Sequence, residues 1–174
     1  MLRSVMKMNI KTKKIVIAAF MTALVCVATM IIKIPSLLKG YINMGDCIVL
    51  VAGWMLSPTY SFLAAALGSA IADVFSGYLI YAPATFVIKG IMAIIAFYGF
   101  KLLKNRLGNM LSRIISGFVS ELMMIFFYFL FEGLLYGFAP SLLNIPSNII
   151  QGIAGLVMGV VLIKIFEKSK ITIH

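Results

Sequence analysis

Histidine and acidic side chains, which carry much of enzyme chemistry, are scarce in this sequence. Of its 174 residues, one is histidine, His174 at the end of the chain, and five are aspartate or glutamate. A single terminal histidine cannot serve a buried Ser-His dyad or a His-rich zinc site. No Gly-x-x-x-x-Gly-Lys-Ser/Thr phosphate loop occurs, so the chain cannot hydrolyse ATP by that route. We therefore expect no catalytic residues, and any active transport must draw its energy from a partner or an ion gradient.

Cysteine is also rare. Cys26 and Cys47 lack the Cys-x-x-Cys spacing of redox and metal motifs, and both lie in or beside apolar segments. Thiols in such places usually pack as small apolar groups. The sequence therefore predicts neither a metal site nor a cofactor.

Long apolar runs dominate what is present. Apolar residues make up 63% of the chain and charged residues 11%, and the mean hydropathy is +1.11. These values predict an all-α integral membrane protein with one transmembrane domain over residues 1–174. We expect a basic N-terminal segment at 1–12, a six-helix bundle at about 13–166 and a short basic tail at 167–174. The six expected transmembrane helices are about 13–33, 46–57, 59–77, 84–102, 112–136 and 147–166. The second is short for a span, so it must be tilted, extended or only partly inserted.

Positive charge is concentrated at alternate connections between these segments. The formal net charge is +10, yet the connections after segments one, three and five hold only Lys33 and Lys39. By the positive-inside bias, both termini are expected on the cytoplasmic side. The basic balance then reflects topology and contact with membrane lipid, and it argues against nucleic-acid binding. Most of the other basic groups lie before segment one (Lys7, Lys11, Lys13, Lys14), around the connection between segments four and five (Lys101, Lys104, Arg106, Arg113) and towards the end of the chain (Lys164, Lys168, Lys170).

Four polar residues from four predicted helices reach nearly the same depth below the extracellular face. Counted from the turn residues at the helix ends, Asp73, Glu132 and Gln151 lie five residues inside and Lys89 lies six, about 7–9 Å at 1.5 Å per residue. Ionised groups at such depth are costly in lipid, so they should face the bundle interior and find partners. The same helical stripes also carry Tyr128, Tyr136 and Asn148. This composition suits a small, planar, polar ligand.

Each of these residues also has a purely structural interpretation. Lys89 could simply neutralise Asp73 or Glu132 inside a packed bundle. Asp46 fits a helix cap better than a ligand contact. Glu121, nearer the cytoplasmic end, fits packing or an interhelical hydrogen bond better than a proton relay. Three tyrosines are consistent with either ligand contacts or interfacial anchors: Tyr41, Tyr78 and Tyr81.

Small residues recur at four-residue spacing in three segments. The third segment carries Ala64, Gly68 and Ala72, and the sixth carries Gly155 and Gly159. Such patterns let helices approach closely, so internal packing is the expected role. In the first segment, Ala19 and Ala23 form an AxxxA pattern near the basic start, which alone is weak evidence for a docking surface.

The order of the motifs resembles a known family. The stretches "GYINMGD" (Gly40–Asp46), "GSAIAD" (Gly68–Asp73) and "YAPATFVIKG" (Tyr81–Gly90), together with AxxxA, look like the substrate-binding S component of an energy-coupling factor (ECF) vitamin transporter. The resemblance covers about residues 13–165. It implies a six-helix subunit that captures a micronutrient at the extracellular side of a bacterial or archaeal cytoplasmic membrane. It also implies partners, namely a transmembrane coupling protein and two cytoplasmic ATPases that drive toppling of the loaded subunit.

The resemblance implies a ligand site in the outer loops and at the outer ends of the later helices. In this sequence that level corresponds to Lys89, Glu132, Asn148 and Gln151, where the depth count led independently. Other candidate ligand contacts are Asp73, Tyr136, Tyr41, Asn43 and Tyr81. AxxxA is the family's contact with the coupling protein, carried here by Ala19 and Ala23.

The ligand follows less directly. The pattern most resembles members associated with the pyrimidine precursor of thiamin and with vitamin B6, and riboflavin carriers are their neighbours. Asp73 and Glu132 could accept hydrogen bonds from ring substituents, and Lys89 could donate one, so a pyridoxine-like or aminopyrimidine ligand is favoured over riboflavin or another vitamin. Two other functions stay open. One is a self-sufficient secondary transporter in which Glu121, Glu132 and Lys89 relay a proton; against it, no inverted repeat is evident. The other is a structural subunit without a ligand.

Overall fold

The computed structural model describes residues 9–36 and 40–168, which fold into an α-helical bundle with one short β hairpin. Most of the expected N-terminal segment 1–12 and of the tail 167–174 therefore lies outside the described residues. In chain order the elements are α2 (Ile10–Ile31), β1 (Lys33–Pro35), β2 (Tyr41–Asn43), α3 (Gly45–Met55), α4 (Pro58–Phe75), α5 (Ala82–Tyr136), α6 (Phe138–Ser141), the 3-10 helix η1 (Leu142–Asn144) and α7 (Ile145–Lys168). The predicted all-α membrane class is confirmed at this level, with the hairpin as an addition.

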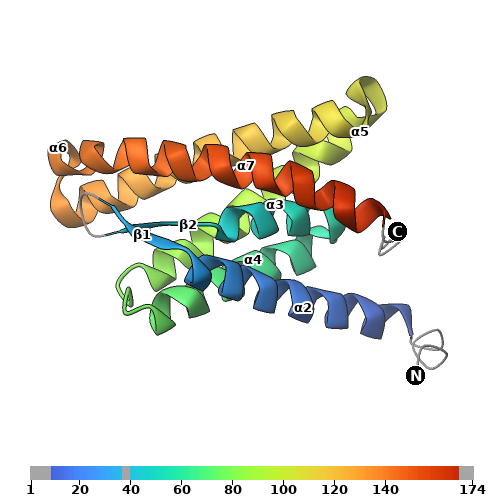
Figure 1. Cartoon of the computed structure of the whole chain (residues 1–174), viewed down its shortest axis with the longest axis horizontal. Coiled ribbons are helices and arrows are strands. Elements are labelled where there is room, and N and C mark those ends of the chain that lie inside the picture. The colour runs from blue at the N-terminus through green and yellow to red at the C-terminus, as the bar shows by residue number, and fades with distance from the viewer. Residues whose placement is uncertain (1–8, 37–39, 169–174) are drawn as a thin grey trace.

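Four helical stretches in the described chain are long and apolar enough to cross a membrane. They are Lys11–Ile31, Pro58–Phe75, Ala82–Tyr136 and Phe138–Lys168. In Figure 1, the beginning of α2 and the end of α7 lie at one end of the bundle, and the hairpin and α6 lie at the other. We call these the terminal end and the hairpin end. The six-span count and the side of the membrane that each end faces stay predictions.

Helix α3 explains why the second apolar segment is short. It has 11 residues, about 16 Å at 1.5 Å per residue, which is half of a bilayer's hydrocarbon core. Its first ten residues, Gly45 to Trp54, are all buried, and it packs against α2, α4, α5 and α7. A helix that is buried on every side, and apolar apart from one paired aspartate, belongs inside a protein. The segment is therefore the centre of the bundle, enclosed by the longer helices.

Helix α5 contains two of the predicted segments. Its 55 residues are broken at Gly108, whose φ of 73° and ψ of 170° are not helical. That φ lies in the region that residues with a Cβ avoid, so glycine suits the break. The arms 82–107 and 109–136 are each about 40 Å long, and Figure 1 shows the second arm folding back from the first. The sequence predicted a longer connection, but the helix resumes directly after the glycine.

Close helix contacts depend on the small residues of α4 and α7. A Cβ added at Gly68 would lie 2.6 Å from the Thr22 carbonyl oxygen of α2, and one at Gly155 would lie 2.8 Å from the Asp46 Cβ of α3. Both distances are too short for a real side chain. The patterns around Gly68 and Gly155 therefore serve internal packing, as predicted.

The hairpin was not predicted. Strands β1 and β2 pair antiparallel, with Lys33 opposite Asn43 and Pro35 opposite Tyr41. A three-residue strand gives almost no alternation signal, and Pro35 reads as a loop residue. The pairing matters for the site because it holds Tyr41 and Asn43 against the helical bundle.

Candidate functional site

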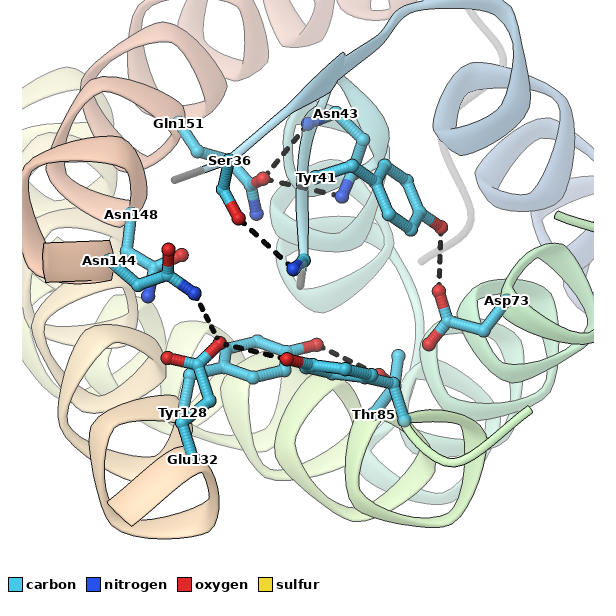
Figure 2. A pocket seen from close by; sticks show the side chains of 12 residues that line it. Ser36, Tyr41, Asn43, Asp73, Thr85, Tyr128, Glu132, Asn144, Asn148 and Gln151 are labelled. Atoms are coloured by element: carbon cyan, nitrogen blue, oxygen red, sulfur yellow. Dashed lines mark hydrogen bonds between the residues drawn. The ribbon is translucent and has the colours of Figure 1, made fainter. Parts of the chain in front are cut away.

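A small polar cavity lies below the hairpin. Its volume is about 30 Å³, room for about two water molecules. Side chains from the hairpin, α4, both arms of α5, η1 and α7 meet there (Figure 2). The lining residues are Ser36, Gly40, Tyr41, Asn43, Asp73, Tyr81, Thr85, Tyr128, Glu132, Asn144, Asn148 and Gln151.

One side of the cavity is formed by Asp73 and Tyr41. Asp73 is 4% exposed, and its Oδ1 atom accepts a hydrogen bond of 2.6 Å from the Tyr41 hydroxyl. Burial, followed by the charge of Asp73, raises the pKa of the Tyr41 phenol well above its usual range. Tyr41 therefore stays a donor at neutral and moderately alkaline pH, and it orients the carboxylate of Asp73.

The opposite side is formed by Glu132 with two asparagines (Figure 2). Glu132 is 3% exposed. Its Oε1 atom accepts hydrogen bonds from the Asn144 amide at 2.8 Å and from the Tyr81 hydroxyl at 3.4 Å. Asn148 lies one helical turn beyond Asn144 and lines the same side. Two segments outside its own helix arm, η1 and the residue before α5, thus hold the carboxylate of Glu132.

Three polar atoms in this cavity have no hydrogen-bond partner among the described residues. They are Asp73 Oδ2, Glu132 Oε2 and Asn148 Nδ2, all buried. A buried polar atom left unpaired costs about 1–3 kcal/mol. The residues that line the cavity therefore carry two unpaired acceptors and one unpaired donor, a set that suits a polar molecule offering two donors and one acceptor.

A buried network lies behind the cavity and supports it. Lys89 forms an ion pair with Asp46, and Asp46 Oδ2 accepts a hydrogen bond of 2.7 Å from the Gln151 amide. Gln151 Oε1 in turn accepts from the backbone N–H of Asn43 at 2.9 Å. The Lys89 ammonium also lies 5.4 Å from the centre of the Tyr128 ring. This network ties the central helix α3 to α5, α7 and the hairpin.

The network corrects two interpretations made from the sequence. From the sequence, Lys89 was expected to pair with Asp73 or Glu132. In the structure it pairs with Asp46 instead. Asp46 is not the cap of its helix, because Met44 holds that position and no side-chain capping bond is formed. A depth count gives the level of a residue but not the direction in which its helix turns it. The central position of α3 puts Asp46 next to Lys89.

The predicted site residues divide into two groups. Seven of them line the cavity: Asp73, Glu132, Asn148, Gln151, Tyr41, Asn43 and Tyr81. Lys89 and Tyr136 do not. Tyr136 instead lines an outer cavity of about 360 Å³, which shares Ser36, Gly40 and Tyr81 with the inner one.

Several lining residues were not among the predicted contacts. Thr85 lies one helical turn before Lys89, and its hydroxyl is 3.0 Å from that of Tyr128. Asn144 lies four residues before Asn148, in a 3-10 helix of three residues. A helix this short leaves no periodic pattern in the sequence from which it could be predicted. Ser36 belongs to the loop of the unpredicted hairpin. For Thr85 and Asn144, spacing of four residues from a predicted site residue was the available signal.

Glu121 is buried away from the cavity. It is 4% exposed, and a Cβ added at Gly155 of α7 would lie 2.9 Å from its Oε1 atom. The packing role is therefore confirmed, but the expected interhelical hydrogen bond is not found among the described residues, where neither carboxylate oxygen has a partner. Among the described residues, no chain of hydrogen bonds leads from Glu121 to Glu132.

The two alanines of the AxxxA pattern lie on the outer face of α2. Both Ala19 and Ala23 are exposed, as are Phe20 and Val27, at 55% and 50%. The opposite face is buried against the bundle. The alanines are thus accessible, as a docking surface requires, and their role as one stays a prediction.

Two comparisons with known proteins bear on this chain. The model of a family described as "ECF-type riboflavin transporter, S component" matches residues 9–168. A protein of Pyrococcus woesei, described as "Uncharacterized protein in gap 3'region", is 31% identical over 136 residues, which is 78% of this chain and 88% of that protein.

Proposed function

The chain belongs to the ECF-type riboflavin transporter S component family, and we propose that it captures a small water-soluble vitamin or vitamin precursor in the cavity below the hairpin. The observation that carries this proposal is that Asp73, Glu132 and Asn148 line one cavity while Asp73 Oδ2, Glu132 Oε2 and Asn148 Nδ2 are buried without partners among the described residues. As a substrate-binding transport subunit, the protein is not an enzyme.

The favoured ligand is a single heteroaromatic ring of the pyridoxine or aminopyrimidine type. Amino, hydroxyl or protonated ring-nitrogen groups can donate to Asp73 and Glu132, and a ring nitrogen or oxygen can accept from Asn148. Tyr41, Tyr81 and Tyr128 supply aromatic surface around the same space. The inner volume of about 30 Å³ must widen even for one ring, and a single ring requires the least widening.

Riboflavin is the second candidate, and the outer cavity favours it. That cavity measures about 360 Å³ and shares the lining residues Ser36, Gly40 and Tyr81 with the inner one. A three-ring ligand with a polyol chain could extend through both, with Tyr78 and Tyr136 beside it. The family's own description names riboflavin.

Uptake is proposed to depend on ATP hydrolysis by partners. The partners are a transmembrane coupling protein and two cytoplasmic ATPases, and the exposed face around Ala19 and Ala23 is the proposed contact with the coupling protein. Most of the described lysines and arginines lie towards the terminal end (Figure 1), so the positive-inside bias supports a cytoplasmic position for that end. The cavity then opens to the outside of a bacterial or archaeal cytoplasmic membrane.

Ligand-dependent unfolding of the purified chain tests the proposal. The chain in detergent is heated with pyridoxine, the hydroxymethyl aminopyrimidine precursor of thiamin, riboflavin and other water-soluble vitamins. A ligand at 100 times its dissociation constant adds about 2.7 kcal/mol to the free energy of unfolding if it binds only the folded state.

Matched variants place the binding site. Glu132→Gln should remove most of the ligand-induced shift, whereas Glu167→Gln, which also removes one carboxylate but at the terminal end of α7, should keep it. If no vitamin shifts the transition, or if both variants lose the shift equally, the proposed capture site is wrong.

A further inference from the structure

A second cavity opens at the terminal end of the bundle, far from the hairpin. Its volume is about 300 Å³. It lies where α2 and α4 begin, where α3 ends, and where the first arm of α5 approaches Gly108. Six of its lining residues define its chemistry: Lys14, Lys101, Lys104, Trp54, Tyr60 and Phe97. The capture function described above uses none of them.

The cavity carries an unbalanced positive charge. Three lysines line it, and no acidic residue of the described chain does. Within residues 9–36 and 40–168, the two ion pairs join Lys89 to Asp46 and Arg113 to Glu167. The cavity lysines are thus not neutralised by any described carboxylate, and Lys101 instead lies 5.8 Å from the centre of the Phe97 ring.

Helix ends at the cavity do not cancel this charge. Helix α4 begins beside it, and the side chain of its N-cap residue Ser57 makes no capping hydrogen bond. The partial positive charge of that N-terminus is offset by the C-terminus of α3, which ends at Met55 in the same cavity. Three full charges remain, so the cavity attracts an anion.

Apart from Ser57, the rest of the lining is aromatic and apolar. Trp54 is 4% exposed and Phe100 is 8% exposed, and Tyr60 and Phe97 are half-buried. A site for a free inorganic anion has no need of such walls. A phospholipid combines the two requirements, because its phosphate suits the lysines and the start of its acyl chains suits the aromatic rings.

The position of the lysines also agrees with a lipid headgroup. Lys14 lies in the first turns of α2, and Lys101 and Lys104 lie in the last turns of the first α5 arm. These places flank apolar spans, where headgroups and interfacial aromatic residues are found. Lys14 lies on the inner face of α2, together with the buried Ala18, Met21 and Val25. The cavity is therefore separate from the outer face that carries Ala19 and Ala23.

We propose that this cavity is a binding site for an anionic phospholipid. The phosphate lies among Lys14, Lys101 and Lys104, and the upper acyl chains contact Trp54, Tyr60 and Phe97. Such a lipid joins α2, α4 and α5 at the end of the bundle where no hairpin holds them together. The proposal does not depend on which vitamin the other cavity takes.

Trp54 provides a direct test because it is the only tryptophan in the chain. Its fluorescence is measured in the purified full chain with phosphatidylglycerol or phosphatidylcholine that carries brominated, quenching acyl chains. We expect phosphatidylglycerol to quench at a concentration at least tenfold lower than phosphatidylcholine. Equal quenching by the two lipids would overturn the proposal, and so would loss of the preference in millimolar inorganic phosphate, which would indicate a soluble anion site.

Two triple variants separate the site from general charge attraction. Lys14→Gln/Lys101→Gln/Lys104→Gln should weaken phosphatidylglycerol quenching at least tenfold. The control Lys11→Gln/Lys13→Gln/Lys164→Gln removes the same charge from exposed lysines outside the cavity and should stay within threefold of the original chain. Equal weakening in both would refute a specific site.

A single substitution tests the site even if the triple variant of Lys14, Lys101 and Lys104 fails to fold. Lys104→Gln changes an exposed side chain, so the fold should persist, and the quenching concentration should rise about threefold. An unchanged value in this variant and in Lys101→Gln would contradict the role of the lysines.

Discussion

The buried ion pair of Lys89 and Asp46 leads to a sharp prediction about stability. Lys89 is 2% exposed and Asp46 is 0% exposed. Lys89→Met keeps the apolar stem but leaves the carboxylate of Asp46 buried without its counter-charge. Removing one partner of such a pair costs about 3–5 kcal/mol. Since whole proteins are stable by only about 5–15 kcal/mol, the variant should be severely destabilised.

A second substitution should restore most of that loss. In Lys89→Met/Asp46→Asn the buried charge is gone, and the side-chain carbonyl introduced at position 46 can still accept the hydrogen bond that Gln151 donates at 2.7 Å. Replacing a buried pair by uncharged groups is often neutral, so the double variant should lie within about 1–2 kcal/mol of the original chain. The coupling between the two sites should therefore be large in a double-mutant cycle.

Reversible unfolding in mixed micelles, with ligand binding measured on the same samples, gives the free energies. Lys164→Met is the matched control, since Lys164 is exposed and its loss should change stability by no more than about 0.5 kcal/mol. If Lys89→Met is as stable as the control but no longer binds the ligand, Lys89 contacts the ligand and the supporting role assigned to it is refuted.

Three further predictions concern the cavity and the helix packing. Asn148→Ala should weaken ligand binding about tenfold with little loss of stability, because its Nδ2 atom has no described protein partner. Gln151→Ala should lower both the ligand affinity and the free energy of unfolding. Ligand titration and unfolding on each variant would show whether the two effects separate. Gly68→Val should lower the free energy of unfolding by about 1–3 kcal/mol, because its Cβ would lie 2.6 Å from the Thr22 carbonyl oxygen; an unchanged unfolding midpoint would contradict the close helix contact. Since burial raises the pKa of Tyr41, its contribution to stability should be complete below about pH 10, the ordinary tyrosine pKa, and should fall as pH rises further; Tyr41→Phe should flatten this alkaline decline, and an identical decline in both proteins would count against the assignment.

Hydropathy alone was enough to predict the membrane class and most helical segments. An apolar run of about 20 residues is a local property, so it can be read without knowing what the helix contacts. That Asp73, Glu132 and Gln151 lie at one common level was also predictable, because helix rise converts residue number directly into distance. All three line the cavity.

The break in α5 was only partly predictable. The basic residues around it indicated a connection, and Gly108 was available for a positive φ. Nothing local showed that the helix would resume immediately, because that depends on how the second arm packs against the first and against α7. The hairpin was not predicted for a similar reason. Its two strands of three residues each are held by pairing with each other and by a hydrogen bond to Gln151, and neither contact can be read from the local sequence.

The sequence by itself determined that this is a helical membrane protein and at which level its polar residues lie, because apolar length and helix rise are one-dimensional properties. Tertiary structure decided the partners. Whether Lys89 meets Asp46, Asp73 or Glu132 depends on the rotation of each helix and on the placement of the short helix α3 at the centre. Those are set by packing between segments far apart in the chain, where a glycine such as Gly155 lets Asp46 approach α7.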